Sequence, residues 1–257
     1  MHLALIRSPV ADCNLAEFFR LVPGSTDNKS LLRSFHGCLS AALAYLHDSG
    51  VRHKDIKPQN VLVEEGNALL TDSGISLDFA ELSRSTTSGD TPKTRRYCAP
   101  KVGAGEKRNS SSDIWSLGCV FVEIMTVLRG EIIDALKRFL KTHGSLHTNF
   151  YMNEATISQW IAKLTATTSD EYENMPSRTI LEMLQMSHDK RPTARMVVKT
   201  LGVVEAGVVF CGICCRRDEA STYDPDSPAY DTIDENGILP SQIAWGSSQL
   251  CLRQPLL

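Results

Sequence analysis

The sequence lacks a run of about 18 apolar residues, the length that a membrane-spanning helix needs, so it predicts no membrane span. The apolar stretch at residues 1–16 is interrupted by Arg7, Pro9 and Asp12, which disfavours a signal peptide. An excess of charge of one sign is also missing, because 27 Lys and Arg residues face 30 Asp and Glu residues in a chain of 257. A balance this near neutral gives no support for a nucleic-acid or membrane-surface partner.

Cysteine is scarce as well. Eight cysteines at irregular spacing do not form the dense framework of a disulfide-stabilised domain. We therefore expect free thiols and an intracellular, reducing location, either cytoplasmic or nuclear. Cys211, Cys214 and Cys215 lie within five residues, and this cluster could bind zinc, carry lipid or consist of plain free thiols.

Acidic residues are concentrated near the end of the chain. Residues 218–240 contain seven acidic residues and no basic one, whereas residues 1–217 contain 26 basic and 23 acidic residues. The acidic segment includes three prolines and few large aliphatic side chains, so it cannot bury enough apolar surface to offset the entropy of ordering. The sequence thus predicts a folded domain over residues 1–205, followed over residues 206–257 by the cysteine cluster and a disordered acidic tail.

Hydrophobic periodicity predicts a mainly α-helical body with a small β-hairpin, in the α+β class. Apolar residues at steps of three and four mark a helix over 31–48, and residues 113–128 are apolar on all sides, as in a helix at the centre of a core. Ser112 is the expected N-cap of this central helix. Two short apolar runs, 61–63 and 68–70, predict the hairpin, and residues 81–95 predict a long polar loop. Further helices are expected over 131–141, 154–165, 176–186 and 193–201.

Two segments supply the groups that transfer of a phosphoryl group needs. Asp55, Lys57 and Asn60 place a carboxylate, an ammonium group and an amide on a loop between the first long helix and the hairpin. Asp72 adds a second carboxylate on a turn just after the hairpin. In such a reaction oxygen ligands hold Mg²⁺, a cation offsets phosphate charge and a carboxylate orients the attacking hydroxyl.

Five segments of the sequence belong together, at residues 53–60, 72–74, 94–101, 113–118 and 189–193. In order and in spacing they resemble the eukaryotic protein kinases of the serine/threonine type. Small-molecule kinases share the pattern of residues 53–60 but not those of residues 94–101 and 113–118. The resemblance covers roughly residues 3–201 and implies the helical C-terminal lobe of the kinase fold, with ATP and Mg²⁺ as cofactors and a protein as substrate or partner.

The resemblance assigns catalytic roles to individual residues. Asp55 would accept the proton of the substrate hydroxyl, Lys57 would stabilise the transferring phosphate, and Asn60 and Asp72 would bind Mg²⁺. Thr94 would lie against Asp55 and favour serine and threonine substrates. The alternative for each is a polar loop residue that only caps or closes a turn.

Other residues of the pattern are expected to be structural: in the family, His53 and Asp113 hold the catalytic loop together. Arg191 normally pairs with a glutamate, but Lys101 stands in that place, and Ser73 replaces a phenylalanine that packs between the two lobes. Because Lys101 cannot pair with Arg191, we expect Lys101→Glu to raise the melting temperature.

The polar loop contains candidate phosphorylation sites. Lys54 takes the place of an arginine that in the family pairs with a phosphate on this loop, and Arg95 and Arg96 are near the candidate sites in sequence. The alternative is an ordinary solvated loop. The candidate sites are Thr86, Thr87, Ser88 and Thr91.

No Gly-x-Gly-x-x-Gly motif occurs in the sequence, and no strand lysine with its pairing glutamate fits before residue 55. The resemblance instead places a last strand and hinge at residues 3–9 and the first helix of the C-terminal lobe at 15–21. We therefore expect an N-terminally truncated kinase domain that is nearly inactive as written, because ATP would be half exposed. The alternative is a non-catalytic pseudokinase that acts as a protein-interaction module.

Overall fold

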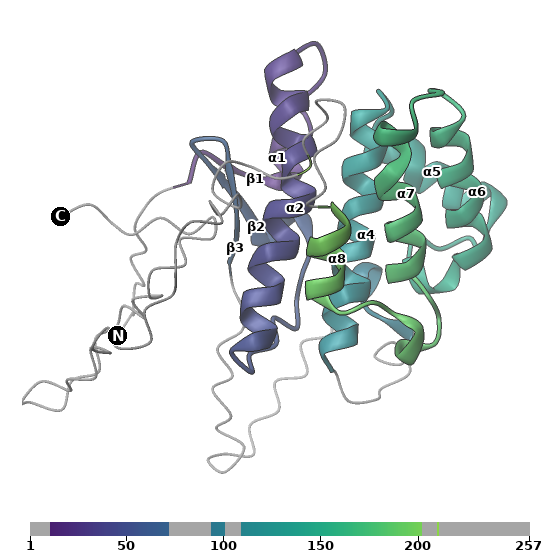
Figure 1. Ribbon diagram of the computed structural model, residues 1–257. Helices are drawn as coiled ribbons and strands as arrows, with labels where there is room; N and C mark the ends of the chain where they lie inside the picture. Colours follow the sequence, from purple (N-terminus) through teal and green to yellow (C-terminus); the bar gives the residue numbers. More distant parts are fainter. Residues whose placement is uncertain (1–10, 72–93, 101–108, 202–209, 211–257) are drawn as a thin grey trace, which may run out of the picture.

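The computed structural model describes residues 11–71, 94–100, 109–201 and 210. The predicted strand and hinge at 3–9, most of the polar loop, the cysteine cluster and the acidic tail lie outside the described residues. The described part is mainly helical, with a small sheet on one side of a layer of helices (Figure 1). The expected fold class, a helical lobe with a small β element, is confirmed.

The predicted hairpin is present and gains a third strand. Strands β2 (Val61–Glu64) and β3 (Asn67–Leu70) are antiparallel, and β1 (Cys13–Asn14) pairs with the free edge of β2. The hairpin turns through Glu65 and Gly66, both with positive φ, as a two-residue turn between twisted strands requires. The sheet order β1-β2-β3 therefore follows the chain.

The first long helix, α2 (Thr26–Asp48), begins five residues before the predicted start. The side chain of Ser25 accepts a hydrogen bond from the Asn28 amide, so the polar first turn is capped although it adds little to the apolar pattern. Gly50, with φ of +73°, follows the end of α2 as expected. The short helix α1 (Leu15–Phe18) lies within the range predicted for the first helix.

Helix α4 (Ser110–Leu128) is the central helix of the described fold. Its N-cap is Asn109 and not Ser112, which instead closes a capping box with Asn109 from the third helical position. By length and composition α4 could cross a membrane, but most of it is buried inside the protein. This burial explains why α4 is apolar on every side.

Four more helices follow α4, close to the predicted ranges. One start was wrong: α7 begins at Glu171, capped by Asp170, and contains Pro176 within it, whereas the sequence suggested a start at the proline. The four helices are α5 (Ile133–His143), α6 (Glu154–Thr165), α7 (Glu171–Met183) and α8 (Ala194–Leu201).

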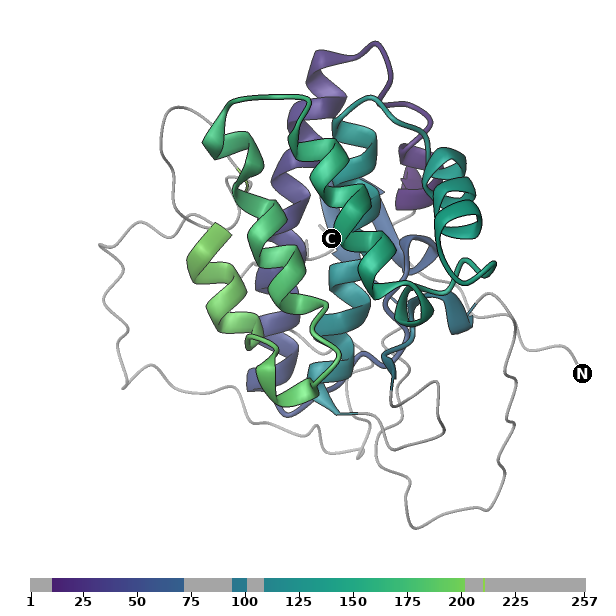
Figure 2. The ribbon, with the colours of Figure 1, turned by 90° about the vertical axis from the view of Figure 1, so that its right-hand side faces the viewer.

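The helices pack around α4 in one continuous core. Helix α4 contacts α2, α5, α6 and α7, and α8 packs along α2 (Figures 1 and 2). Trp115, Phe121 and Trp160 are among the largest fully buried side chains. The loop that follows α2 and the start of α4 are thereby held on a rigid framework.

Candidate active site

The loop with the predicted catalytic residues connects α2 to β2. It closes in a short 3-10 turn at Pro58–Asn60, in which the Asn60 amide donates to the Lys57 carbonyl at 2.9 Å. The Thr71 amide donates to the Asn60 carbonyl at 3.0 Å, so the chain just beyond β3 is fastened to the loop. Residues 53–60 and the end of the hairpin therefore form one local structure.

Asp55, Lys57 and Asn60 meet within hydrogen-bonding distance. Lys57 Nζ donates to Asp55 Oδ2 at 2.6 Å, and Asn60 Nδ2 donates to the same oxygen at 3.0 Å and to the Asp55 carbonyl at 2.9 Å. One carboxylate oxygen is thus held by two donors, which fixes the side chain. The side chain of Asp55 keeps 32% of its exposure, so its carboxylate can be reached from solvent.

Asp113, at the start of α4, accepts hydrogen bonds from the backbone of the loop. Its Oδ2 accepts from the His53 amide and its Oδ1 from the Lys54 amide, both at 2.9 Å. His47 Nε2 lies 3.1 Å from Oδ2. Lys54 has a φ of +70°, a strained conformation for a residue with a side chain, and the bond from its amide to Asp113 stabilises it.

His53 is fully buried beneath the loop. Burial lowers the pKa of His53 below its ordinary value, although the Asp113 carboxylate and the Thr71 backbone act in the opposite direction. A neutral, buried ring suits packing inside the lobe better than proton transfer with a substrate.

Arg191 is buried and binds backbone oxygens. Its guanidinium donates to the carbonyls of Gln185, Met186 and Ser111 at 2.7, 3.1 and 2.9 Å and lies over the Trp115 ring. No carboxylate pairs with it within the described ranges, and burial lowers its pKa to about 10. Lys101, the expected counterpart, lies outside those ranges.

A buried ion pair that the sequence reasoning missed joins the turn at residues 94–97 to α4. Arg96 donates to Glu123 Oε1 at 2.8 Å and to the Thr148 carbonyl, and the Tyr97 hydroxyl lies 3.1 Å from both Glu123 oxygens. Burial acts to lower the pKa of Arg96, but Glu123 and Tyr97 outweigh it and the pKa rises. Arg96, considered above beside the phosphorylation sites, is therefore committed to Glu123.

One sequence signal could have revealed this pair. Glu123 is an acidic residue in the middle of a helix that is otherwise apolar on all sides, and a buried carboxylate needs a cationic partner. The sequence does not say which of the available cations supplies it.

The structure brings together only part of the predicted site. Asp55, Lys57 and Asn60 form one cluster, and His53 and Asp113 lie directly behind it. Thr94 belongs to a short 3-10 turn, Thr94–Tyr97, and the position of its side chain is not described. The remaining predictions, namely Asp72 and the phosphorylation sites Thr86, Thr87, Ser88 and Thr91, lie outside the described residues.

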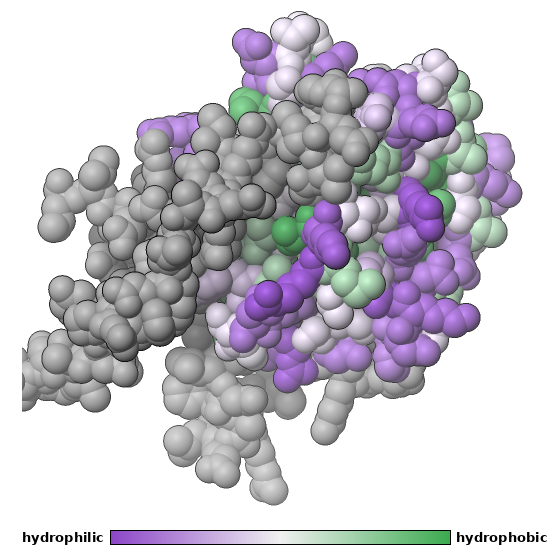
Figure 3. Space-filling view, viewed as in Figure 1, coloured by the Kyte–Doolittle hydropathy of each residue, from purple (hydrophilic) through white to green (hydrophobic). Residues whose placement is uncertain are grey.

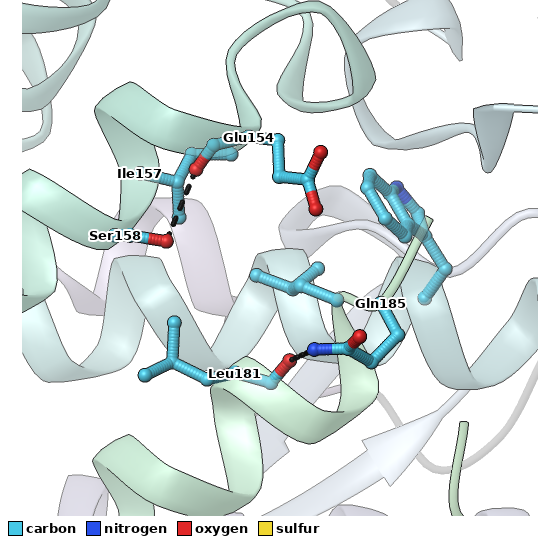
Figure 4. A pocket seen from close by; sticks show the side chains of 7 residues that line it. Glu154, Ile157, Ser158, Leu181 and Gln185 are labelled. Carbon is cyan, nitrogen blue, oxygen red and sulfur yellow. Dashed lines mark hydrogen bonds between the residues drawn. The ribbon is translucent and has the colours of Figure 1, made fainter. Parts of the chain in front are cut away.

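The pocket in Figure 4 lies away from this cluster, between α4, α6 and α7. Ser158 donates to the Glu154 carbonyl and Gln185 to the Leu181 carbonyl, so each of these polar side chains bonds to a carbonyl four residues earlier in the chain. No residue of the catalytic loop lines this pocket. We therefore place the candidate active site at the loop.

Comparison with known proteins agrees with the motif order. The family model of the protein kinase domain matches residues 5–201. The serine/threonine-protein kinase AtPK1/AtPK6 of Arabidopsis thaliana is 32% identical over 110 residues, 42% of this chain and 23% of that protein. The serine/threonine-protein kinase nekl-2 of Caenorhabditis elegans is 33% identical over 132 residues, 49% and 34% respectively. The chain thus spans only about a quarter to a third of the length of these relatives.

Proposed function

Because the chain belongs to the protein kinase family, we propose that it transfers the terminal phosphoryl group of ATP to serine or threonine hydroxyls of proteins. The relatives described above are serine/threonine-protein kinases, which supports this choice of acceptor. The observation that carries the proposal is the cluster of Asp55, Lys57 and Asn60, since these groups match the needs of phosphoryl transfer.

In this proposal Asp55 orients the attacking hydroxyl. Its Oδ2 is occupied by Lys57 and Asn60, and no described residue donates to Oδ1, which leaves that oxygen to accept the hydroxyl proton. Lys57 also places a positive charge beside the carboxylate, where it can offset the charge of a transferring phosphate. The chemistry depends on positioning, and two hydrogen bonds to one oxygen provide it.

Asn60 suits the magnesium ion that the family uses. Its side-chain nitrogen donates to Asp55, so its amide oxygen points away from these bonds, and no described residue donates to it. An amide oxygen is a fitting ligand for a hard cation, and Asp72 would be the second protein ligand. When bound, Mg²⁺ neutralises phosphate charge, while the chain's own contribution is to hold the ligand oxygens in place.

The first test measures phosphate transfer from Mg-ATP to a serine- and threonine-rich substrate protein. The kinase for this test is purified from the cells that naturally produce it. Asp55→Asn keeps the shape but removes the proton acceptor, and we expect a fall of at least about 100-fold. The control is Asp48→Asn, which alters an exposed pair with Arg195 and should leave the rate unchanged. Equal rates for wild type and Asp55→Asn would contradict the proposed role.

A pseudokinase that only binds partners is the second candidate function. Ser73, Lys101 and the absence of a Gly-x-Gly-x-x-Gly motif from the 257 residues favour it. For the same reason we propose that the 257-residue chain alone turns over ATP very slowly. The pseudokinase is supported if folded protein from native cells transfers no more phosphate than the Asp55→Asn variant does. The proposed slow turnover of the 257-residue chain is contradicted if the isolated chain turns over ATP clearly.

A further inference from the structure

One face of α5 carries three basic residues and a single acid. Asp134 precedes Lys137 and Arg138 by three and four residues, and Lys141 follows them by four and three, so the four residues share one side of the helix. Lys137 donates to Asp134 at 2.9 Å, and Asp134 is the single acid of this face. Arg138 and Lys141 are exposed and form no ion pair with any described residue. The face therefore has a net positive charge.

Arg20 extends the positive charge from a second element. Lys137, which contacts Asp134, lowers the pKa of that carboxyl most, and the charges of Arg138 and Arg20 lower it further. Arg20 is exposed and, among the described residues, has no ion pair of its own. We name the set of Arg20, Lys137, Arg138 and Lys141 the basic patch.

Exposed apolar side chains border the basic patch. Leu21, next to Arg20, is 56% exposed, and Ile132, just before α5, is 58% exposed. A surface that combines unpaired cations with accessible aliphatic groups fits an acidic peptide that also carries apolar residues.

Three exposed cations elsewhere are paired with acids, whereas Lys190 and Lys199, which are also exposed, form no ion pair with a described residue. The face formed by α7 and α8 carries hydrophilic residues among hydrophobic ones in Figure 3, and Arg178 and Arg195 of these helices are paired with acids. These pairs, and a third on α6, are Arg178 with Glu182, Arg195 with Asp48 and Lys163 with Glu131. Arg138 and Lys141 lie together on one helix face, whereas Lys190 and Lys199 belong to two different elements.

We propose that the basic patch is the docking surface for the chain's own acidic segment, residues 218–240. That segment has seven acidic residues and no basic one, and it includes Tyr223, Tyr230, Ile233 and Leu239 as apolar groups. It begins eight residues after Phe210, which is buried against α2. Eight extended residues reach about 27 Å and the acidic segment itself far more, so the chain can span the domain.

The docking is electrostatic and reversible. Each contact between exposed charges contributes little, and several together give a salt-sensitive association within one molecule. When the acidic segment occupies the basic patch, other acidic partners cannot bind there. Phosphorylation of Ser or Thr in the segment would add negative charge and so strengthen the docking. The inference does not depend on phosphoryl transfer by the chain.

Zero-length carbodiimide cross-linking of the full chain tests the docking, because it joins lysine amines to carboxylates in contact. We expect amide links from Lys141 or Lys137 to acids of residues 218–240, and few from the exposed Lys163. The variant Arg20→Ala/Arg138→Ala removes charge but keeps both reporter lysines, and we expect the yield to fall about fivefold. The matched control Arg178→Ala/Arg195→Ala removes two arginines elsewhere and should leave the yield unchanged.

A mixture of ¹⁵N-labelled and unlabelled chains shows whether the link is internal. Links within one isotopic species at every protein concentration support docking within a molecule. The proposal would be overturned by cross-links mainly between labelled and unlabelled chains. It would also be overturned by equal yields at Lys163 and Lys141, or by an unchanged yield in Arg20→Ala/Arg138→Ala. None of these outcomes depends on kinase activity, so failure here leaves the proposed function untouched.

Discussion

Asp113 shows how one side chain can organise a loop that is remote in sequence. Two backbone amides of the catalytic loop donate to its two oxygens, and one of those amides belongs to Lys54, whose φ is positive. The carboxylate is almost fully buried, so water cannot replace either bond. Loss of one acceptor therefore costs more here than at the surface.

We predict that Asp113→Asn lowers the free energy of unfolding by about 3 kcal/mol, because one loop amide would face an NH₂ group instead of an oxygen. The measurement is thermal or denaturant unfolding. Asp134→Asn makes the same chemical change at an exposed site and should shift stability by less than about 0.5 kcal/mol. Similar losses in the two variants would contradict the importance of this bond.

Single residues also show where sequence reasoning succeeds. The spacing of Asp55, Lys57 and Asn60 was enough to group them, because they lie on one short loop whose ends are fixed by a helix and a strand. Their roles remain a proposal. Glu123 was missed because its partners, Arg96 and Tyr97, meet it only when the turn at residues 94–97 packs on α4.

At the scale of elements, the hairpin turn departs from its ideal sequence. Glu65 has a φ of +45° and precedes Gly66, at +77°. Both central positions of such a turn favour residues that tolerate the left-handed region, and Asn-Gly is the preferred pair. Glu65 therefore holds a conformation that asparagine adopts at lower cost.

We expect Glu65→Asn to stabilise the protein by about 0.5–1 kcal/mol and to raise its melting temperature by a few degrees. Glu64→Asn, one residue earlier in β2, should instead be neutral or destabilising, because asparagine disfavours strands. A scanning-calorimetry comparison decides the matter, and a lower melting temperature for Glu65→Asn would count against the turn as described.

Helix α2 is joined to a residue beyond the last described helix. The Gly37 amide donates to the Phe210 carbonyl at 2.6 Å, while the Arg33 carbonyl is engaged by His36 Nδ1. The Phe210 ring lies edge-on to His36 and is only 2% exposed. Phe210 lies past residue 205, the predicted end of the folded domain, and still packs against α2.

This contact predicts that Phe210→Ala destabilises the fold by about 3 kcal/mol, as for other buried aromatic side chains. Met196→Ala, at an exposed position of α8, should change stability by less than about 0.5 kcal/mol. Urea unfolding of both variants supplies the comparison. A Phe210→Ala variant as stable as wild type would show that residue 210 adds nothing to the fold.

At the scale of the whole molecule, the buried His36 links stability to pH. It packs against Phe121 and Phe210, is fully buried, and donates from Nδ1 to the Arg33 carbonyl. Burial lowers its pKa to about 4 from an ordinary value of 6.5. Between these values the unfolded chain binds more protons than the folded protein, so stability falls as the pH drops.

We predict that this residue alone removes about 3 kcal/mol of stability between pH 6.5 and pH 4, with the full contribution present above pH 6.5. The pKa of His53 is also lowered, so it adds a loss of the same sign. The variant His36→Phe keeps an aromatic ring but has no group that titrates. We therefore expect the free energy of unfolding, measured with urea, to fall less steeply between pH 6.5 and pH 4 in this variant. An unchanged decline would exclude His36 as its source.

The helices, the hairpin and the order of the kinase motifs could be predicted from the amino-acid sequence alone. Periodic apolar residues and turn residues act over a few positions, and local propensity already favours the same elements that the fold uses. The family follows from motif order, which requires no knowledge of contacts. The starts of α4 and α7 were predicted at the wrong residues. Their N-caps are Asn109 and Asp170, and each lies in a polar stretch where several residues could cap the helix.

Which residues from distant segments contact one another depends on the tertiary packing. The pairing of Arg96 with Glu123, the amides of His53 and Lys54 on Asp113, and the bond from Gly37 to Phe210 all join separate segments. A charge or an amide can accept many partners of suitable chemistry. The packing of α2 and α4 selects among them by bringing one partner within reach and excluding water from the rest.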